Sequence, residues 1–475
     1  MTLLGTKIIC TIGPASESAH MVDNLIRAGM NVARLNFAHG THEEHINRIR
    51  HVRESAANHG LPVGILLDIP GPKIRTGRLR KKRVHIEQDS QITLTPKQVM
   101  GNEHLIPISI PGLAEAVKPG SLIYLDEGEI KLEVIDITGI NVVCKVIVSG
   151  ELGSEKGINV PGASLNVPAI TQTDIEHVLL GIEYGVDFFA LSFVRKAQDI
   201  SLLKEILRQR NSDTPIIAKI ENHEALRNID EIIAASDGLM IARGDLGIEI
   251  PIERTPIVQK EIIRKCNHAG KPVIVATQML ESMGDSPYPT RAEVTDVANA
   301  IFDGADAIML SGETAVGKYP FTAVQMMIRI ARESESMLRS EPMGSRRETH
   351  LEPQPDDAIS FAACHTAHQL EAKAIIALTA TGSTAQRVSK YRPHVPILAI
   401  ASSDTICRRL ALTWGVYPYE VARANTLQEL FAQGATLSRE KGLASDGDLV
   451  IITAGLPIGV EGSTNMLKVE TIQPL

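Results

Sequence analysis

The sequence predicts an α/β fold: a (β/α)8 TIM barrel with an inserted β-barrel-like lid domain and a C-terminal α/β domain. Eight strand-like apolar runs alternate with helical patterns, at residues 7–11, 31–35, 63–67, 187–192, 215–219, 238–242, 272–277 and 306–310. The interval after the third run is far too long for one βα unit, and alternating segments typical of antiparallel strands fill it. Near the end of the chain, further apolar runs alternate with helical segments.

The elements divide into four predicted segments. The barrel begins in residues 1–70, and the lid, with RVHIEQ, QITLT, SLIYL, IKLEV and NVVCKVIV as strands, occupies 71–167. The barrel resumes over 168–342, where the Thr-x-x-Asp pattern at Thr171 predicts a capped helix. A polar, proline-bearing stretch at 340–357 indicates a linker. The last domain, 343–475, contains AIIALT, ILAIAS, YPYEV and DLVIITAG, which predict a mostly parallel sheet.

The composition excludes several classes of protein. A chain of 475 residues with 44% hydrophobic residues can bury large cores. A net charge of −8 argues against a general nucleic-acid binder, although it leaves room for a local basic pocket. The longest apolar runs have the length of strands, so no membrane span is expected. The N-terminus lacks the pattern of a signal peptide, which predicts a cytoplasmic location. Five scattered cysteines without CxxC spacing predict reduced thiols.

Polar side chains follow four of the barrel runs, in AKIEN, ARGDLGIEI, ATQMLES and MLSGETA. Because parallel strands of a barrel end on one rim, we expect these side chains to meet there: Lys219, Glu221, Asp245, Thr277 and Glu313. A lysine, carboxylates and a hydroxyl on one rim can bind a divalent metal and an anionic oxyacid together. Glu221 and Asp245 are hard oxygen ligands suited to Mg2+ or Mn2+.

The first half of the barrel adds cations to the same rim. Arg34 and Asn36 end the second run, Asp68 ends the third, and Lys73 and Arg75 follow where the insertion begins. A planar guanidinium can hold a phosphoryl group through two hydrogen bonds, and a compact ammonium can follow the group during transfer. A single strand-end charge is more often solvated or salt-bridged than catalytic, so only the coincidence on successive strands supports a site.

Two loops can present several backbone N–H groups, which suggests that they bind anions. The ARGD turn can present N–H groups, including that of Gly244, to a carboxylate, and Thr277 could hydrogen-bond the same group. In the C-terminal domain, LTATGSTAQRVSKYRP places a possible phosphate cradle between a strand and a helix, formed by Thr379, Thr381, Gly382, Ser383 and Thr384. An ordinary βα turn with a helix cap explains this second loop equally well.

A set of long motifs, in order, resembles the pyruvate kinase family. They are TKIICTIGPAS, ARLNFAHG, DIPGPKIRTG, GINVPG, LSFVR, AKIEN, ARGDLGIEI, ATQMLESM, PTRAEVTDVANAI and DGADAIMLSGETAVGKYP. The resemblance implies a barrel with a closing lid and a regulatory C-terminal domain, usually in a homotetramer. It also implies the final step of glycolysis, transfer of phosphoryl from phosphoenolpyruvate to ADP to give pyruvate and ATP.

The resemblance also implies roles for individual residues. Lys219 would stabilise the transferring phosphoryl group, and Glu221 and Asp245 would bind the divalent metal. Phosphoenolpyruvate would contact Arg34, Lys219, Gly244, Asp245 and Thr277. The nucleotide would contact Asn36, Phe37, Ala38 and His39, together with Arg75 and, from the lid, Lys156. The C-terminal loop resembles a sugar-phosphate effector site, and Ala380 stands where members that respond to a bisphosphate have lysine, which favours a monophosphate.

The chain departs from the family pattern at two positions. Ala38 replaces a serine, and Lys73 replaces the glutamate of potassium-dependent members. Ala38 removes a hydroxyl ligand, and Lys73 would bring an ammonium close to Asn36 and Asp68 and repel a second cation. Our hypothesis is that the Lys73 ammonium replaces K+, so that activity does not require it. The alternative is that Lys73 points to solvent and K+ still binds.

Two other functions compete with the kinase prediction. A different metal-dependent barrel enzyme acting on phosphoenolpyruvate or pyruvate, such as a lyase or carboxylase, could use a similar site. The lid with Lys156, and the group of Arg34, Asn36 and Arg75, favour a nucleotide partner instead. A catalytically inactive sugar-phosphate sensor is the second alternative, and the presence of Lys219, Glu221, Asp245 and Thr277 argues against it.

Overall fold

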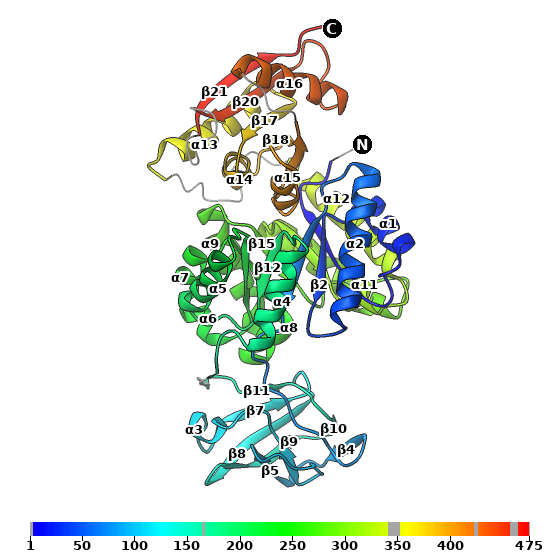
Figure 1. The fold of residues 1–475 in the computed structure, drawn as a ribbon, viewed down its shortest axis with the longest axis vertical. Coiled ribbons are helices and arrows are strands. Elements are labelled where there is room, and N and C mark those ends of the chain that lie inside the picture. Colours follow the sequence, from blue (N-terminus) through cyan, green and yellow to red (C-terminus); the bar gives the residue numbers. More distant parts are fainter. Residues whose placement is uncertain (1–2, 164–166, 341–351, 422–425, 457–463, 475) are drawn as a thin grey trace.

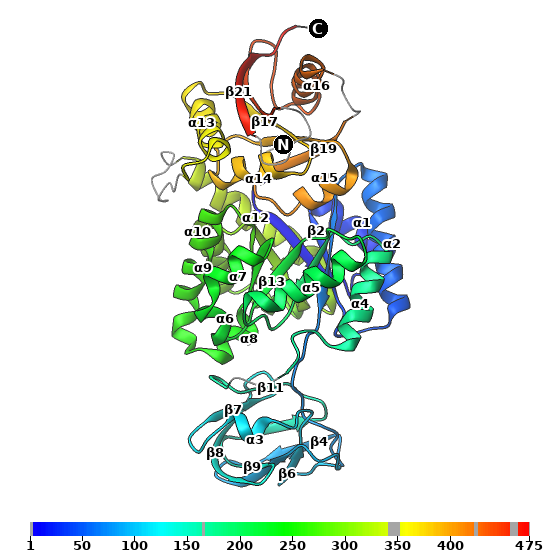
Figure 2. The ribbon, with the colours of Figure 1, turned by 60° about the vertical axis from the view of Figure 1, so that its left-hand side comes forward.

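The chain folds into three units arranged along the long axis of the molecule (Figures 1 and 2). The computed structural model describes residues 3–163, 167–340, 352–421, 426–456 and 464–474. The barrel lies in the middle, the lid lies at one end and the C-terminal domain lies at the other, beside the N-terminus. Among the described residues, no helix combines the length and the apolar character needed to cross a bilayer.

Eight parallel strands close the central barrel in the order β1-β16-β15-β14-β13-β12-β3-β2. They are β1 (Lys7–Thr11), β2 (Val32–Asn36), β3 (Gly64–Ile69), β12 (Phe188–Leu191), β13 (Ile216–Ile220), β14 (Gly238–Ala242), β15 (Val273–Ala276) and β16 (Ala307–Leu310). Each coincides with a predicted run to within a few residues, because fully buried parallel strands are continuous apolar segments. The predicted barrel is confirmed, and its strands end at one edge, which we call the carboxyl-end rim.

Helices surround the barrel, and a polar side chain caps the start of several of them. They are α1 (Ala19–Ala28), α2 (His42–His59), α4 (Gln172–Glu183), α5 (Ala197–Gln209), α6 (His223–Arg227), α7 (Ile229–Ala235), α8 (Arg243–Glu249), α9 (Thr255–Ala269), α10 (Arg291–Asp303), α11 (Gly312–Ala315) and α12 (Pro320–Arg339), with short 3-10 turns η1 (Ile252–Arg254) and η2 (Glu281–Gly284). The cap predicted for α4 is present: Thr171 Oγ1 accepts from the Asp174 N–H at 3.1 Å, and Asp174 accepts from the Thr171 N–H at 2.8 Å.

The lid is a β-domain joined to the barrel by two chain segments (Figure 2). It contains β4 (Arg83–Ile86), β5 (Gln91–Thr95), β6 (Leu105–Pro107), β7 (Leu122–Leu125), β8 (Ile130–Thr138), β9 (Asn141–Val148), β10 (Gly150–Gly153), β11 (Ile158–Asn159) and the short helix α3 (Leu113–Ala116). Six strands form one sheet in the order β11-β7-β8-β9-β5-β6, and β10 pairs with β4. The entry segment of the lid approaches α4, because the Gly71 N–H donates to Asp174 at 3.2 Å.

The C-terminal domain has a five-stranded sheet in the order β19-β18-β17-β20-β21. Its elements are α13 (Pro355–Gln369), β17 (Ala374–Thr379), α14 (Ser383–Lys390), β18 (Ile397–Ala401), α15 (Asp404–Leu410), β19 (Val416–Glu420), α16 (Leu427–Glu440), β20 (Leu449–Gly455) and β21 (Thr464–Thr471). The antiparallel edge strand β21 was not predicted, because its alternating pattern contains few apolar residues. Most of the predicted linker, residues 341–351, lies outside the described residues.

The C-terminal domain packs against the amino ends of the barrel strands, away from the carboxyl-end rim. Leu412 is buried in the same cluster as barrel residues such as Ile9 and Met240. Arg408 donates to Asp187, just before β12, at 2.8 Å. Lys7, at the start of β1, donates to the Val416 carbonyl at 2.7 Å. The carboxyl-end rim is therefore left to the lid.

Candidate active site

Lys219 is the centre of a buried charge cluster at the carboxyl-end rim. Its ammonium donates to Ser192 Oγ at 2.7 Å and to Asp68 Oδ1 at 3.2 Å, and it lies 3.0 Å from Glu221 Oε1. Burial opposes the charged form of Lys219, but Asp68 and Glu221 outweigh it and raise the lysine pKa. The ammonium is thus held charged at a position reached from three neighbouring strands, which suits it to stabilise an anion.

Asp68 connects Lys219 to Arg34. The Arg34 guanidinium donates from Nε to Asp68 Oδ2 at 2.7 Å, and from its terminal nitrogen to Thr11 Oγ1 at 3.0 Å. Burial would raise the pKa of Asp68, but Lys219 and Arg34 together lower it. One ionised carboxylate therefore holds two cations side by side. Asp68 was predicted to belong to a monovalent-cation region, and among the described residues its charged partners are these two side chains.

Glu221 and Asp245 form the acidic part of the rim. Burial raises the pKa of Glu221, the nearby Lys219 opposes this rise, and Asp245 adds to it by repulsion. Glu221 Oε2 also accepts from the Phe193 N–H at 2.6 Å. Phe193 has a φ of 54°, a left-handed conformation that directs this N–H toward the carboxylate. Glu221 is buried and Asp245 is partly exposed, and two carboxylates that repel each other are well suited to a divalent cation, which would neutralise both.

Thr277 fixes the turn that follows β15. Its hydroxyl accepts from the Gly244 N–H at 2.8 Å and donates to the Ala276 carbonyl at 2.6 Å. Thr277 and Gln278 have φ values of 68° and 57°, which are unusual for residues with a Cβ and mark local strain. Arg243 stabilises the turn by donating a hydrogen bond to the Thr277 carbonyl at 2.7 Å. These contacts fix the Thr277 hydroxyl beside the start of α8.

Glu313 does not belong to this cluster. Its side chain is buried, and its carboxylate accepts from the Leu280 N–H at 3.1 Å and the Ser311 N–H at 2.7 Å. These bonds tie the loops after β15 and β16 to each other. The expectation that Glu313 joins the chemistry at the rim is therefore wrong, because backbone donors occupy its carboxylate.

Lys73 reaches the rim from the start of the lid, where it lies 3.4 Å from Asp245 Oδ1. Its side chain is one-quarter exposed, so the ammonium is neither fully solvated nor buried. In the described part of the chain its ion-pair partner is Asp245, whereas the sequence placed the ammonium close to Asn36 and Asp68. Asn36, the other predicted neighbour, uses its side-chain oxygen to accept from the Ala38 N–H at 3.2 Å.

The predicted nucleotide contacts come from two separate places. The loop Asn36 to His39 lies on the barrel, where the Phe37 side chain is buried and its ring stacks on His45 with centroids 3.9 Å apart. Phe37 therefore anchors the loop instead of exposing its ring. On the lid, Arg75 donates to the Glu155 carbonyl at 3.0 Å, and Lys156 donates to Asp126 at 2.8 Å. Neither lid cation contacts the barrel loop in this structure.

The C-terminal loop is partly occupied by its own contacts. The Gly382 N–H donates to Thr379 Oγ1 at 2.8 Å, and Thr381 donates to Ser383 Oγ at 3.2 Å. Thr384 is buried, and its hydroxyl pairs with that of Thr464 at 2.8 Å. Ser383 and the exposed Thr381 remain as side chains that a ligand could reach, whereas Thr384 supports the fold.

Sequence reasoning missed three residues that hold the site. Ser192 and Thr11 receive hydrogen bonds from Lys219 and Arg34, and Asp296 pairs with Arg243 at 2.7 Å. Ser192 and Thr11 stand at the carboxyl ends of β12 and β1, the same position that identified Lys219. That position could have revealed them, but an isolated hydroxyl carries a much weaker signal than a charge.

Comparisons with known proteins agree along the whole chain. The family model "Pyruvate kinase, barrel domain" matches residues 4–324, and "Pyruvate kinase, alpha/beta domain" matches 357–470. Pyruvate kinase of Geobacillus stearothermophilus is 49% identical over 473 residues, covering 99% of this chain and 81% of the relative. That of Clostridium acetobutylicum is 45% identical, covering 98% and 99%. A crystal structure of a pyruvate kinase from Cryptosporidium parvum matches with a TM-score of 0.92 and 38% identity, covering 99% of this chain and 96% of the other.

Proposed function

The chain belongs to the pyruvate kinase family and is a phosphotransferase, and we propose that the carboxyl-end rim transfers phosphoryl from phosphoenolpyruvate to ADP through the residues named here. The observation that carries the proposal is the buried contact of Lys219 with Asp68 and Glu221. Phosphoryl transfer depends mainly on positioning and on charge stabilisation, which such a preorganised ammonium supplies.

Arg34 and Lys219 bind the phosphoryl group, and the Gly244 to Asp245 turn and Thr277 bind the carboxylate of phosphoenolpyruvate. In the reaction, the bond between phosphorus and the enol oxygen breaks, and a terminal phosphate oxygen of ADP forms the new bond to phosphorus. The remaining enolate takes a proton at carbon and becomes pyruvate. Thr277 with a neighbouring water is our candidate for delivering that proton.

The family requires a divalent metal such as Mg2+. Glu221 and Asp245 would hold it here, since both are carboxylates and their mutual repulsion favours a cation between them. When bound, the metal supplies positive charge to substrate oxygens and orients them. Oxygen atoms of the substrate and of water would supply its remaining ligands.

We further propose that Asn36 to His39, Arg75 and Lys156 contact the nucleotide, and that the lid brings Arg75 and Lys156 to it. Arg75 and Lys156 exchange their lid partners, the Glu155 carbonyl and Asp126, for phosphate oxygens. The division into barrel (1–70 and 168–342), lid (71–167) and C-terminal domain (343–475), the homotetramer and the cytoplasmic location belong to the same proposal.

The Lys73 ammonium replaces the monovalent cation. It stands at the rim beside Asp245, and Ala38 offers no side-chain ligand to K+. The test is the initial rate of pyruvate formation with phosphoenolpyruvate, ADP and Mg2+ in buffer whose only monovalent cation is a bulky organic ion. We expect full turnover that changes little when K+ is added. Strong activation by K+ would overturn this part of the proposal.

A phosphorylated sugar activates through the loop of Thr379 to Thr384. The loop stands at the start of α14, where N–H groups are available to an anion, and Ser383 and Thr381 add hydroxyls. Ala380 provides no cation for a second phosphate, which favours a monophosphate. Activation of the wild-type rate at low phosphoenolpyruvate by a panel of sugar monophosphates and bisphosphates tests the site's preference.

A further inference from the structure

The loop of residues 36–40, which joins β2 to α2, is fixed at both of its ends. At its start, the Phe37 N–H donates to the Asp68 carbonyl at 3.1 Å, which ties the loop to β3. At its end, Thr41 and Glu44 form the capping box of α2, in which the Thr41 N–H donates to Glu44 at 2.7 Å. The exposed middle of the loop lies between these two anchors and contacts the first turn of α2.

His45, in the first turn of α2, binds the middle of this loop. Its Nε2 lies 2.9 Å from the carbonyl oxygen of His39. A carbonyl oxygen can only accept, so Nε2 carries the proton and donates it. The His45 ring is buried, whereas the His39 side chain is exposed. The bond therefore holds the backbone of His39 from the inside and leaves the side chain of His39 available to a ligand.

The other ring nitrogen of His45 faces a group that can only donate. Arg48 Nη1 lies 3.5 Å from His45 Nδ1, and Glu17 holds the same guanidinium by accepting from two of its nitrogens at 3.0 and 2.6 Å. Burial lowers the pKa of His45 to about 4, the bond to His39 opposes this fall, and Arg48 adds to it. The imidazole is therefore neutral near pH 7, and its one N–H is directed at the loop.

Packing fixes the plane of the His45 ring. The ring stacks on Phe37 with centroids 3.9 Å apart and an interplanar angle of 11°, and His177 of α4 packs on the edge of Phe37 at 5.0 Å. All three rings are buried. Gly40, with a φ of 90°, passes so close that an added Cβ would stand 3.4 Å from His45 Nε2. A rotation that turned the N–H away from the loop would therefore disrupt the stacked rings.

We propose that His45 is a positioning residue, whose Nε2 N–H holds the His39 backbone in the shape in which residues 36–39 contact the nucleotide. The inference rests on the proposed nucleotide role of that loop. The proposed contacts to phosphoenolpyruvate are held separately, since Asp68 and Thr11 fix the Arg34 guanidinium. Loss of the bond from His45 should therefore weaken binding of ADP and leave binding of phosphoenolpyruvate nearly unchanged.

The test compares three substitutions of His45 with wild type in the full-length enzyme. H45F keeps a ring to stack on Phe37 but removes the donor, and H45N, whose amide is too short to reach the His39 carbonyl, removes the donor without adding bulk. H45Q places an amide N–H near the position of Nε2 and is the conservative variant. H59A is the matched control, because His59 lies on the same helix and pairs with Asp23 at 2.7 Å, away from the loop.

We expect H45F and H45N each to raise KM for ADP about fivefold, the range expected for one hydrogen bond between neutral groups. KM for phosphoenolpyruvate should stay within about twofold of wild type in both variants. H45Q should restore KM for ADP to within about twofold, and H59A should leave both constants unchanged. Because H45N adds no volume, it tests the bond even where the larger phenyl ring of H45F prevents folding.

Three results would overturn the inference. The first is a wild-type KM for ADP in H45F or H45N. The second is an equal increase in both KM values, which would assign His45 a general structural role. The third is an H45Q enzyme as impaired as H45N, which would trace the effect to the ring and not to the N–H. A wild-type enzyme without ADP-dependent pyruvate formation would instead contradict the proposed function, on which the inference rests.

Discussion

At the scale of single residues, the rim works by holding opposite charges in fixed contact. Asp68 accepts from both Arg34 and Lys219, so two cations that would repel each other are kept at one place. Burial makes each charge expensive unless it is paired, and the pairing explains why Lys219 stays protonated. The substrate phosphoryl group would then enter a site whose positive charge is already assembled, at little reorganisation cost.

Lys73 gives a prediction at this scale. K73M removes the ammonium beside Asp245 without adding a charge. If this ammonium replaces K+, the variant lacks both cations in K+-free buffer. We expect the rate in K+-free buffer to fall at least about tenfold and to recover partly when K+ is added. Initial rates with and without K+ measure this. K82M, at an exposed lid lysine, is the control, and an unchanged K+-free rate in K73M would show that Lys73 has no such role.

How far the sequence could reveal the site differs from residue to residue. Lys219, Glu221, Asp245 and Thr277 follow apolar runs directly, and the barrel rule brings them to one rim. Glu313 has the same placement but binds backbone N–H groups, a distinction that depends on the path of two loops. The partner of Lys73 was equally hidden, because the position of a lid relative to a barrel depends on contacts far apart in sequence.

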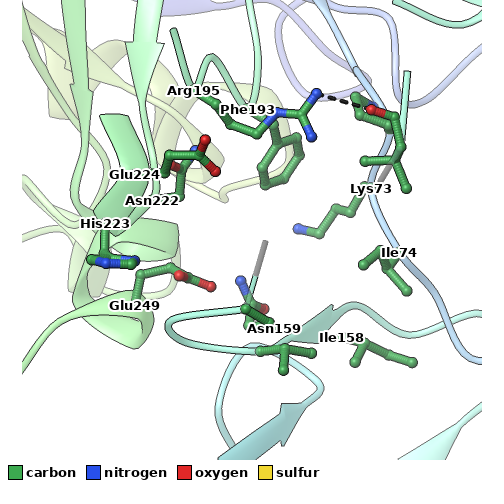
Figure 3. A pocket seen from close by; sticks show the side chains of 14 residues that line it. Lys73, Ile74, Ile158, Asn159, Phe193, Arg195, Asn222, His223, Glu224 and Glu249 are labelled. Atoms are coloured by element: carbon green, nitrogen blue, oxygen red, sulfur yellow. Dashed lines mark hydrogen bonds between the residues drawn. The ribbon is translucent and has the colours of Figure 1, made fainter. Parts of the chain in front are cut away.

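At the scale of elements, α8 runs from the carboxyl-end rim to the side of the barrel that faces the lid. Its first turn contains Asp245 at the carboxyl-end rim, and its last residue, Glu249, lines a pocket together with Ile158 and Asn159 of the lid (Figure 3). The strained turn at Thr277 fixes the start of this helix through Gly244. The backbone strain and the charge at this place are compensated by the surrounding barrel, as is common at functional sites.

The raised pKa of Glu249 predicts a pH dependence of stability. Its pKa is about 7 in the folded chain, against 4.5 for the ordinary side chain, so the folded state binds the proton more tightly. The stability from this group is complete below pH 4.5 and is lost as the pH rises through 7. E249Q does not titrate, so its melting temperature relative to wild type should increase from about pH 5 to about pH 8.

Thermal unfolding in the presence of a chelator measures this difference without interference from a bound metal. E253Q is the matched control, because it removes a carboxylate that is exposed to solvent. A constant difference between E249Q and wild type over this pH range would show that burial does not hold the Glu249 proton.

The loop of Thr379 to Thr384, our proposed effector site, contains one hydroxyl near the surface and one in the interior. Ser383 contacts Thr381 at the surface, whereas Thr384 pairs with Thr464 in the interior. S383A should reduce the response to a sugar phosphate and leave stability unchanged. T384V should lower the free energy of unfolding by about 1 to 3 kcal/mol, because it leaves a buried hydroxyl without its partner. Activation curves and denaturant unfolding of both variants test this division, and a normal response in S383A would place the effector elsewhere.

At the scale of the whole molecule, the barrel separates the lid from the C-terminal domain (Figure 1). The lid meets the carboxyl-end rim, and the C-terminal domain meets the amino ends of the same strands (Figure 1). Asp306 precedes β16 and binds Arg392 of the C-terminal domain, and Asp187 precedes β12 and binds Arg408. A change in the C-terminal domain would therefore reach the rim along barrel strands, since the two domains contact opposite ends of them.

The domain junction gives a prediction at this scale. Arg392 donates to Asp306 at 2.8 Å and to Asn267 at 3.0 Å, and its guanidinium lies 5.0 Å from the centre of the Trp414 ring. R392A leaves the buried Asp306 without this cation, which should cost about 3 kcal/mol or more. We expect calorimetry to show a lower melting temperature and separate unfolding of the C-terminal domain. A single transition at the wild-type temperature would show that Arg392 does not hold the C-terminal domain to the barrel.

The central claim is that the Lys219 ammonium stabilises the phosphoryl group in transfer. The most direct measurement is kcat for pyruvate formation by K219M at saturating phosphoenolpyruvate, ADP and Mg2+, with K204M, an exposed ion-paired lysine, as the control. We predict a loss of about a thousandfold in K219M, a folded protein by circular dichroism, and a normal rate in K204M. A folded K219M enzyme with a kcat within about tenfold of wild type would contradict the claim.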